Sequence, residues 1–150
     1  MTFYEEEIQK NIDNLEKEGR LSLTKGFIQH GNVSVYEHCL AVCVCSIKIA
    51  RMLRIRYDLR ALIRGTLLHD YFLYDWHVND DPNRKLHGFF HPSVALENAL
   101  KDYELSKKEQ DIIKHHMFPL TIIPPMCREA WLVCLADKIC AGKETLLRRQ

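Results

Sequence analysis

The stretch ALIRGTLLHD, residues 61–70, decides the fold class of this chain and gives the first indication of its chemistry. Ile63, Leu67 and Asp70 recur at helical spacing, so they are expected to share the core-facing side of one helix. His69 lies beside this stripe. A carboxylate in such a position is costly to bury unless it is neutralised, paired or bound to a metal ion.

Two other predicted helices carry polar residues in the same kind of position. Their core-facing stripes are His38-Val42-Cys45-Ile49 and Ala130-Cys134-Asp137-Ala141. His116 follows Ile112 and Ile113 at helical spacing and is therefore expected to face inward as well. Several imidazoles together with two or three carboxylates suit a first-row divalent metal such as Mn, Fe, Co, Ni or Zn.

A second interpretation needs no metal. Asp137 can pair with Arg51 or Arg64, and each inward histidine can be a hydrogen-bonded core residue. Any one of these pairings is the more common outcome for a single site. Because the polar residues recur on several separate helices, the metal interpretation is favoured.

The remaining patterns predict helices along the whole chain and almost no strand. Capping boxes are expected at Ser34–Glu37 and Ser106–Glu109, and Pro92 is expected at a first helical position. The predicted helices cover about residues 3–18, 35–53, 59–68, 92–103, 107–118 and 126–147. The aromatic segment 71–90 is predicted to be a functional loop.

These patterns predict an all-α fold, a compact bundle of about six helices. We expect residues 1–150 to form a single domain, with its core at about 30–142 and the helix 3–18 packed on it.

Composition excludes several classes of protein. The 150 residues carry 21 Lys+Arg and 20 Asp+Glu, a net charge of +1 that argues against a basic nucleic-acid binder. The chain has no run of about 20 apolar residues and no secretory signal. Its six cysteines include no CxxC pair, so we expect reduced cysteines in the core and a cytoplasmic location.

Around His69-Asp70 the sequence resembles a known family. Leu67-Leu68-His69-Asp70 is similar to the "LLHD" signature of the HD superfamily of metal-dependent phosphohydrolases. An upstream histidine in Tyr36-Glu37-His38 and a late aspartate in Leu135-Ala136-Asp137-Lys138 keep the order of that family. The resemblance covers about residues 30–142 and implies an HD-domain-like helical fold.

Two further segments resemble the six-ligand version of the family, which binds two metal ions. His91-Pro92-Ser93-Val94-Ala95 is similar to its "HPE-x-G/A" helix start, and Ile112-Ile113-Lys114-His115-His116 is similar to its "I-x-x-H" helix. Carried over residue by residue, the resemblance implies these metal ligands: His38, His69, Asp70, His91, His116 and Asp137. His115 stays open as the alternative to His116, and His87 as the alternative to His91.

The resemblance also implies an activity. It is the hydrolysis of a small phosphoester, with a nucleotide as the first expectation, by a hydroxide between two divalent ions (Fe, Mn, Co, Ni, Zn or Mg). Asp70 and His69 are expected to be catalytic, and Asp70 to bridge the ions. His87, Lys138 and Arg84 are candidates for contact with the substrate. We expect a small phosphorylated substrate as the partner, no nucleic acid and no membrane; the oligomeric state stays open.

Two departures from the family pattern narrow the range of activities that the resemblance implies. Residues 117–120 read Met-Phe-Pro-Leu where HD-GYP phosphodiesterases have "GYP", so cyclic-dinucleotide phosphodiesterase activity is not supported. Residues 71–77 replace the common "HD-I/L-G-K" continuation and remove a lysine that could touch phosphate. The same ligands leave two other functions open, a mixed-valent di-iron oxygenase and a non-catalytic metal-binding regulatory domain.

Overall fold

The computed structural model describes residues 2–73 and 87–148. Its elements in chain order are α1 (Phe3–Glu18), the 3-10 helix η1 (Leu21–Gly26), β1 (Ile28–His30), β2 (Val33–Ser34), α2 (Val35–Met52), α3 (Leu59–Leu68), α4 (His87–Asp102), α5 (Lys107–His115) and α6 (Arg128–Arg148). Helices dominate the described residues, and the predicted all-α fold is confirmed.

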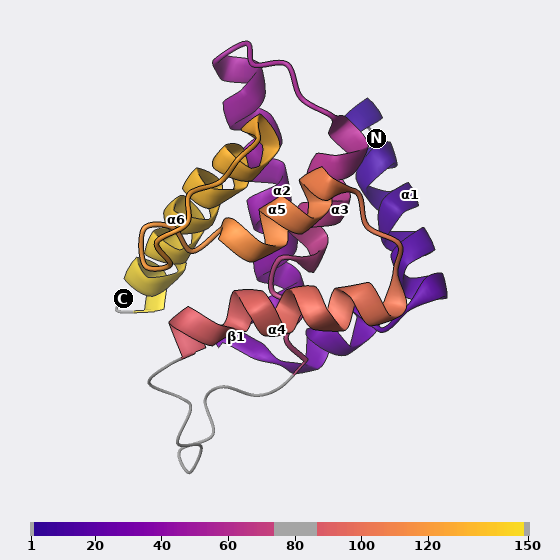
Figure 1. Cartoon of the computed structure of the whole chain (residues 1–150), viewed down its shortest axis with the longest axis vertical. Coiled ribbons are helices and arrows are strands. Elements are labelled where there is room, and N and C mark those ends of the chain that lie inside the picture. The colour runs from indigo at the N-terminus through magenta and orange to yellow at the C-terminus, as the bar shows by residue number, and fades with distance from the viewer. Residues whose placement is uncertain (1, 74–86, 149–150) are drawn as a thin grey trace.

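Four helices form the centre of the fold (Figure 1). Helix α2 packs against α6 and α3, while α5 packs against α3 and α6 from another side. Helix α4 lies against α5, and α1 runs along α3 at the edge of the molecule. Fully buried aliphatic side chains such as Ile63 and Ile112 fill the space between the central helices. The ends of α3 and α5 and the inner faces of α2 and α6 therefore meet in one region.

The helix starts follow the caps that the sequence predicts. Ser34 accepts a hydrogen bond from the Glu37 N–H at 3.1 Å, and Ser106 accepts one from the Glu109 N–H at 3.2 Å. In both pairs the serine hydroxyl also donates to the glutamate carboxylate. Both reciprocal bonds of a capping box are made at the start of α1, between Thr2 and Glu5, where no box was predicted.

The prediction for Pro92 was wrong. Helix α4 begins at His87, so Pro92 lies in its second turn and not at its first position. The proline ring removes one N–H that would otherwise bond the carbonyl of Gly88. Packing outweighs this loss, because Ala95 and Ala99 on the same helix are fully buried in the core.

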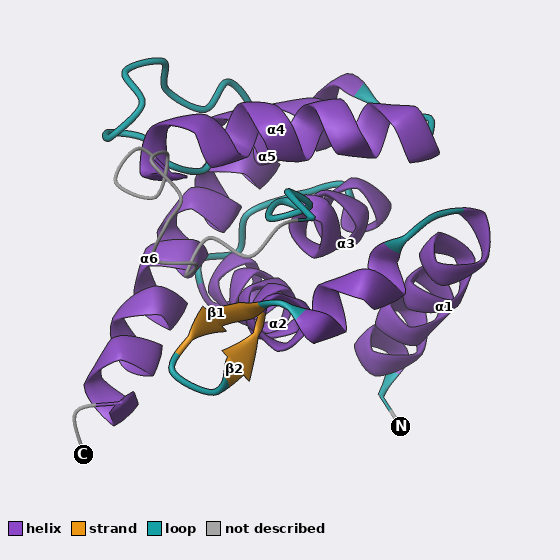
Figure 2. Cartoon of the chain, turned by 90° about the horizontal axis from the view of Figure 1, so that it is seen from below, coloured by secondary structure: helices purple, strands orange, loops and turns teal. Residues whose placement is uncertain are grey.

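A short β-hairpin between η1 and α2 was also not predicted. Strands β1 and β2 pair antiparallel across a turn in which Gly31 has a φ of 58°. Five strand residues are too few to show the alternation of apolar and polar side chains that identifies a strand in a sequence. The hairpin lies beside α2, which follows it directly (Figure 2).

The expectation for the cysteines is confirmed, since all six are free. Four of them, Cys39, Cys43, Cys134 and Cys140, are buried and pack as small apolar side chains. Within the described residues, no helix combines the length and the hydropathy needed to cross a membrane.

Candidate metal centre

The six predicted ligands come together at the centre of the fold, and we refer to them as the His/Asp cluster. They are His38 on α2, His69 at the C-cap of α3, Asp70 directly after it, His91 on α4, His116 at the C-cap of α5, and Asp137 on α6. None of these side chains belongs to a residue more than 7% exposed. The end of α3 places His69 and Asp70 between the other helices.

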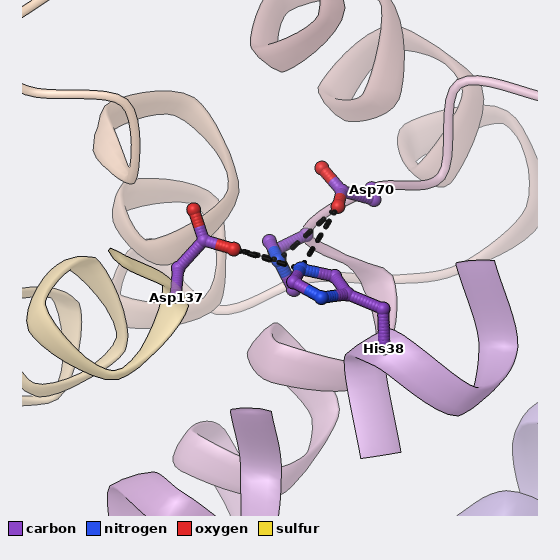
Figure 3. Close-up of side chains that lie close together, drawn as sticks. His38, Asp70 and Asp137 are labelled. Carbon is purple, nitrogen blue, oxygen red and sulfur yellow. Dashed lines mark hydrogen bonds and ion pairs between the residues drawn. The ribbon is translucent and has the colours of Figure 1, made fainter. Parts of the chain in front are cut away.

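One half of the cluster gathers around the Oδ1 atom of Asp137. The Nε2 atoms of His38 and His69 lie 2.8 and 3.3 Å from this oxygen. The Oδ2 atom of Asp70 lies 3.6 Å from Nε2 of His38 and 3.4 Å from Nε2 of His69. Figure 3 shows both carboxylates directed at the imidazole of His38. These four residues can each offer one ligand atom, and the four atoms lie within 4.8 Å of one another.

The other half of the cluster gathers around the second oxygen of Asp70. Its Oδ1 atom lies 3.1 Å from Nε2 of His91 and 3.3 Å from Nε2 of His116. The two Nε2 atoms are themselves 2.8 Å apart. Asp70 therefore belongs to both halves and presents one carboxylate oxygen to each.

Outer hydrogen bonds fix how three of the histidines face the cluster. The Nδ1 atom of His38 donates to the carboxylate of Glu144 at 2.9 Å. In the same way Nδ1 of His69 donates to a backbone carbonyl at 2.6 Å, and Nδ1 of His116 donates to one at 2.8 Å. Because carbonyls and carboxylates only accept, the Nε2 atom of each neutral ring keeps its lone pair for the interior. Histidine ligands of metal ions are commonly held by this kind of second hydrogen bond.

The residues present fit a bound cation, as His116 and Asp70 illustrate. Burial lowers the pKa of His116, so its ring is neutral and its Nε2 atom has a lone pair, which faces Nε2 of His91 at 2.8 Å. That lone pair lies 3.3 Å from the buried Oδ1 atom of Asp70, which has no hydrogen-bond partner among the described residues. A lone pair and a carboxylate oxygen repel each other unless a proton or a metal cation lies between them. Nitrogen and oxygen donors in this combination suit a divalent first-row metal.

In the half of the cluster around Asp137, protonated histidines balance the charge of the carboxylates when no metal is bound. Burial opposes the charged form of His38, but hydrogen bonds to Asp137 and Glu144 outweigh it and raise the pKa of His38 to about 10. Burial also opposes the charged form of Asp137, and contacts with His38 and His69 outweigh it, so the pKa of Asp137 lies well below its ordinary value. The pKa of Asp70 is likewise lowered against burial, chiefly by the charge of His69.

The adjacent histidines 115 and 116 have different positions. His115 is directed away from the cluster, and its Nδ1 atom lies 2.5 Å from Oδ1 of Asp111. His116 is fully buried and contacts Asp70. Of the two positions that the sequence left open, the structure therefore brings His116 into the cluster.

Of the three candidates for substrate contact, only Lys138 has a described side chain. Arg84 and the side chain of His87 lie outside the described residues. The Nζ atom of Lys138 donates to the backbone carbonyl of His116 at 3.2 Å and also lies 3.2 Å from Sγ of Cys134. Contact of Lys138 with a substrate stays a prediction.

The arginine pairings of the second interpretation are not the ones observed. Arg64 forms a buried ion pair with Glu109, with Nε 3.0 Å from the carboxylate. The guanidinium of Arg51 lies 4.9 Å from the ring centroid of Tyr4. Asp137 pairs with histidines of the cluster instead.

Two residues at the cluster were missed by sequence reasoning. Glu144 lies seven positions after Asp137 on α6, and this helical spacing was a usable signal. Gln29 comes from β1, and its Nε2 atom donates to Oδ2 of Asp70 at 3.1 Å. No periodic pattern in the sequence marks Gln29.

Comparisons with known proteins agree with this geometry. The family model described as HD domain matches residues 35–142, from the first residue of α2 into α6. No curated protein and no solved structure matches the chain. The matched range contains all six residues of the His/Asp cluster. The chain belongs to the HD domain family, within the HD superfamily of metal-dependent phosphohydrolases.

Proposed function

We propose that this protein is a metal-dependent phosphohydrolase that acts on a small phosphoester, with nucleotides as the first substrates to test. The observation that carries the proposal is the shared carboxylate of Asp70. Its Oδ2 atom faces His38 and His69, which also contact Asp137, and its Oδ1 atom faces His91 and His116. Two ligand groups that share one carboxylate are the arrangement that a two-ion centre needs.

In this proposal, Asp70 and the five other residues of the cluster hold two divalent ions. When bound, such ions lower the pKa of coordinated water to about 7 and neutralise charge on a phosphoryl oxygen. The roles of Asp70 and His69 follow from their positions. Asp70 ties the two groups together, and the ring of His69 contacts both carboxylates while lying edge-on to His116 at 4.7 Å between centroids. His69 therefore orients both halves of the centre.

A small substrate agrees with the charge of the molecule. The net charge of +1 offers no large excess of positive charge for nucleic acid, so we propose that the ions supply the charge that a phosphate needs. The six free cysteines support a cytoplasmic setting as part of the proposal. We further propose that α1 belongs to the same domain as the cluster, because Leu15 on α1 is fully buried and its carbonyl accepts a hydrogen bond from Tyr103.

The first test is the metal content of protein purified without a chelator. Two ions per chain are expected for the wild type. His116→Ala should lose at least one ion, because it removes a nitrogen that faces Asp70. His115→Ala is the matched control and should keep both ions, because His115 pairs with Asp111 outside the cluster. Wild-type protein without any bound ion would contradict the proposal.

The second test is turnover with added Mn, Co, Ni or Mg on a panel of nucleotides and generic phosphoesters. Wild-type protein should release phosphate or alcohol, and Asp70→Ala should lose both the metal and the turnover. Two bound ions with no turnover on any substrate would support the non-catalytic regulatory alternative. Bound iron with oxygen consumption would support the oxygenase alternative.

A further inference from the structure

Gln29 has the opposite orientation to the one that hydrophobic burial predicts. Successive side chains of a strand point to opposite faces. On β1 the apolar residue Ile28 is 38% exposed, whereas the neighbouring Gln29 is only 7% exposed. Burying the amide and exposing the isoleucine costs stability, because a buried polar group needs hydrogen bonds to replace water. This orientation therefore calls for a reason other than packing.

Gln29 also lies at an irregularity in the hairpin. Ile28 pairs with Ser34, and His30 pairs with Val33. Gln29 is therefore an extra residue in β1 that has no paired residue in β2. Bulges of this kind are common next to functional sites. The backbone around it is held, since the Val35 N–H at the start of α2 donates to the Phe27 carbonyl at 2.8 Å.

The side chain of Gln29 reaches the carboxylate of Asp70, which both halves of the cluster share. Nε2 of Gln29 donates to Oδ2 of Asp70 at 3.1 Å, across 41 positions of sequence. Strand β1 contacts both α2 and α6, the helices that carry His38 and Asp137. Figure 2 shows β1 beside α2, and this strand carries the residue whose side chain reaches Asp70.

This contact selects one orientation of the Asp70 carboxylate. A hydrogen bond to Oδ2 restricts the rotation of the carboxylate group about its last bond, together with the histidine contacts. In that rotation Oδ2 faces His38 and His69, and Oδ1 faces His91 and His116. We infer that Gln29 is the positioning residue of Asp70, and that it sets the affinity of both halves of the cluster for divalent metal. This inference rests on the proposed two-ion centre.

The test measures the affinity of each metal site by competition with a chromophoric chelator, using Zn²⁺ or Mn²⁺ alone. Gln29→Leu removes the donor, and Gln29→Asn keeps the amide but shortens the side chain by about 1.5 Å. Both variants should bind both ions about 10–100-fold more weakly than the wild type, the usual effect of removing an outer hydrogen bond to a metal ligand. Gln110→Leu is the matched control, because that amide bonds the Leu105 carbonyl outside the cluster.

Weaker metal binding at both sites is the result that distinguishes a positioning role of Gln29 from a packing role. A residue that only packs the hairpin would lower the melting temperature of the metal-free protein and leave both dissociation constants unchanged. Wild-type affinity at both sites in both Gln29 variants would therefore overturn the inference. Wild-type protein that binds no metal would instead contradict the proposed function.

A measurement on wild-type protein covers the case in which the variants do not fold. In ¹⁵N-edited NMR spectra, the side-chain amide of Gln29 should exchange slowly with solvent and should shift when Zn²⁺ is added. The side-chain amide of Gln9, which bonds Asp13 at the surface, is the internal reference and should not shift. A Gln29 amide that exchanges rapidly and does not respond to Zn²⁺ would overturn the inference.

Discussion

His38 lies between two carboxylates, one on each ring nitrogen. Its Nδ1 atom donates to Glu144, and its Nε2 atom faces Asp137 at 2.8 Å. The outer carboxylate makes the inner nitrogen a stronger donor to a cation and fixes the plane of the ring. Glu144 thus orients His38 by an outer hydrogen bond, as we infer that Gln29 orients Asp70. Unlike Gln29, Glu144 acts on one half of the cluster only.

Glu144→Gln is predicted to weaken one metal site. The amide keeps the size of the side chain but removes the negative charge opposite His38. The affinity of the site that contains His38 should fall about 10–100-fold, while the site of His91 and His116 should keep its wild-type affinity. The same chelator competition measures both constants. Equal loss at both sites would show that Glu144 acts through the fold and not through His38.

Metal binding is predicted to release protons. In metal-free protein the pKa of His38 is raised to about 10, so the ring is charged at neutral pH. An ion at Nε2 must displace that proton, so metal affinity should rise with pH up to about 10. Calorimetric titration with Zn²⁺ in buffers of different ionisation enthalpy counts the protons released. A heat of binding that is the same in every buffer would contradict this prediction.

In metal-free protein, His38 also makes the stability of the fold depend on pH. The direction is opposite to that of metal affinity, because stability falls as the pH rises. Because the pKa of His38 is raised on folding, its contribution to stability is complete below the unfolded value of about 6.5. That contribution is lost as the pH rises towards about 10. Urea unfolding of the metal-free protein at pH 6.5 and pH 10 should show this decrease.

At the level of single residues, the sequence identified the metal-ligand candidates of the cluster better than it identified how neighbouring side chains are placed around them. Asp70 and Asp137 could be predicted because a carboxylate on an apolar stripe contradicts burial unless something binds it. The order of His38, His69-Asp70 and the late Asp137 then matched a family. Gln29 could not be predicted, because its strand of three residues is too short to show a pattern of apolar and polar side chains.

The close approach of α3 and α5 depends on one glycine. A Cβ atom on Gly65 would lie 2.5 Å from Cδ1 of Ile112 and 3.0 Å from its Cβ. Because α3 ends at the His/Asp cluster and His116 follows α5, this contact sets how near Asp70 comes to His116. Helix packing at Gly65 is therefore part of the geometry of the candidate metal centre.

Gly65→Ala is predicted to destabilise the protein by about 1–3 kcal/mol, the usual cost of overpacking a core. Gly142→Ala is the matched control on α6, where an added Cβ would meet nothing within 4 Å. That change should stabilise the protein by about 0.5–1 kcal/mol through helix propensity. Urea unfolding measures both effects. A neutral or stabilising Gly65→Ala would mean that Ile112 moves aside without cost.

The helices were more predictable than what connects them. Asp58 and the serine caps mark helix starts through local hydrogen bonds that a sequence can specify. The start of α4 was missed because Pro92 suits a first turn, whereas the helix begins five residues earlier, at His87.

The whole molecule encloses the cluster, and metal binding is therefore coupled to its stability. The ligand atoms come from helices that also form the hydrophobic core. An unfolded chain does not keep these atoms together, so each bound ion stabilises the folded state.

Metal removal is predicted to lower the melting temperature. An ion present at about a hundred times its dissociation constant adds roughly 2.7 kcal/mol to stability. For a domain of this size, each kcal/mol corresponds to about 2–4 °C. Thermal unfolding with and without EDTA should therefore differ by roughly 5–10 °C per ion. Asp70→Ala is the control and should not respond; an unresponsive wild type would contradict the coupling.

The distance in sequence between the ligands has a consequence for synthesis of the protein. His38 and Asp137 contact each other across 99 positions, and Glu144 follows later still on α6. Asp70, His91 and His116 all precede α6 in the chain, whereas the half that contains His38 lacks Asp137 until α6 has been made. The half that contains His38 is therefore the last part of the His/Asp cluster whose ligands are all synthesised.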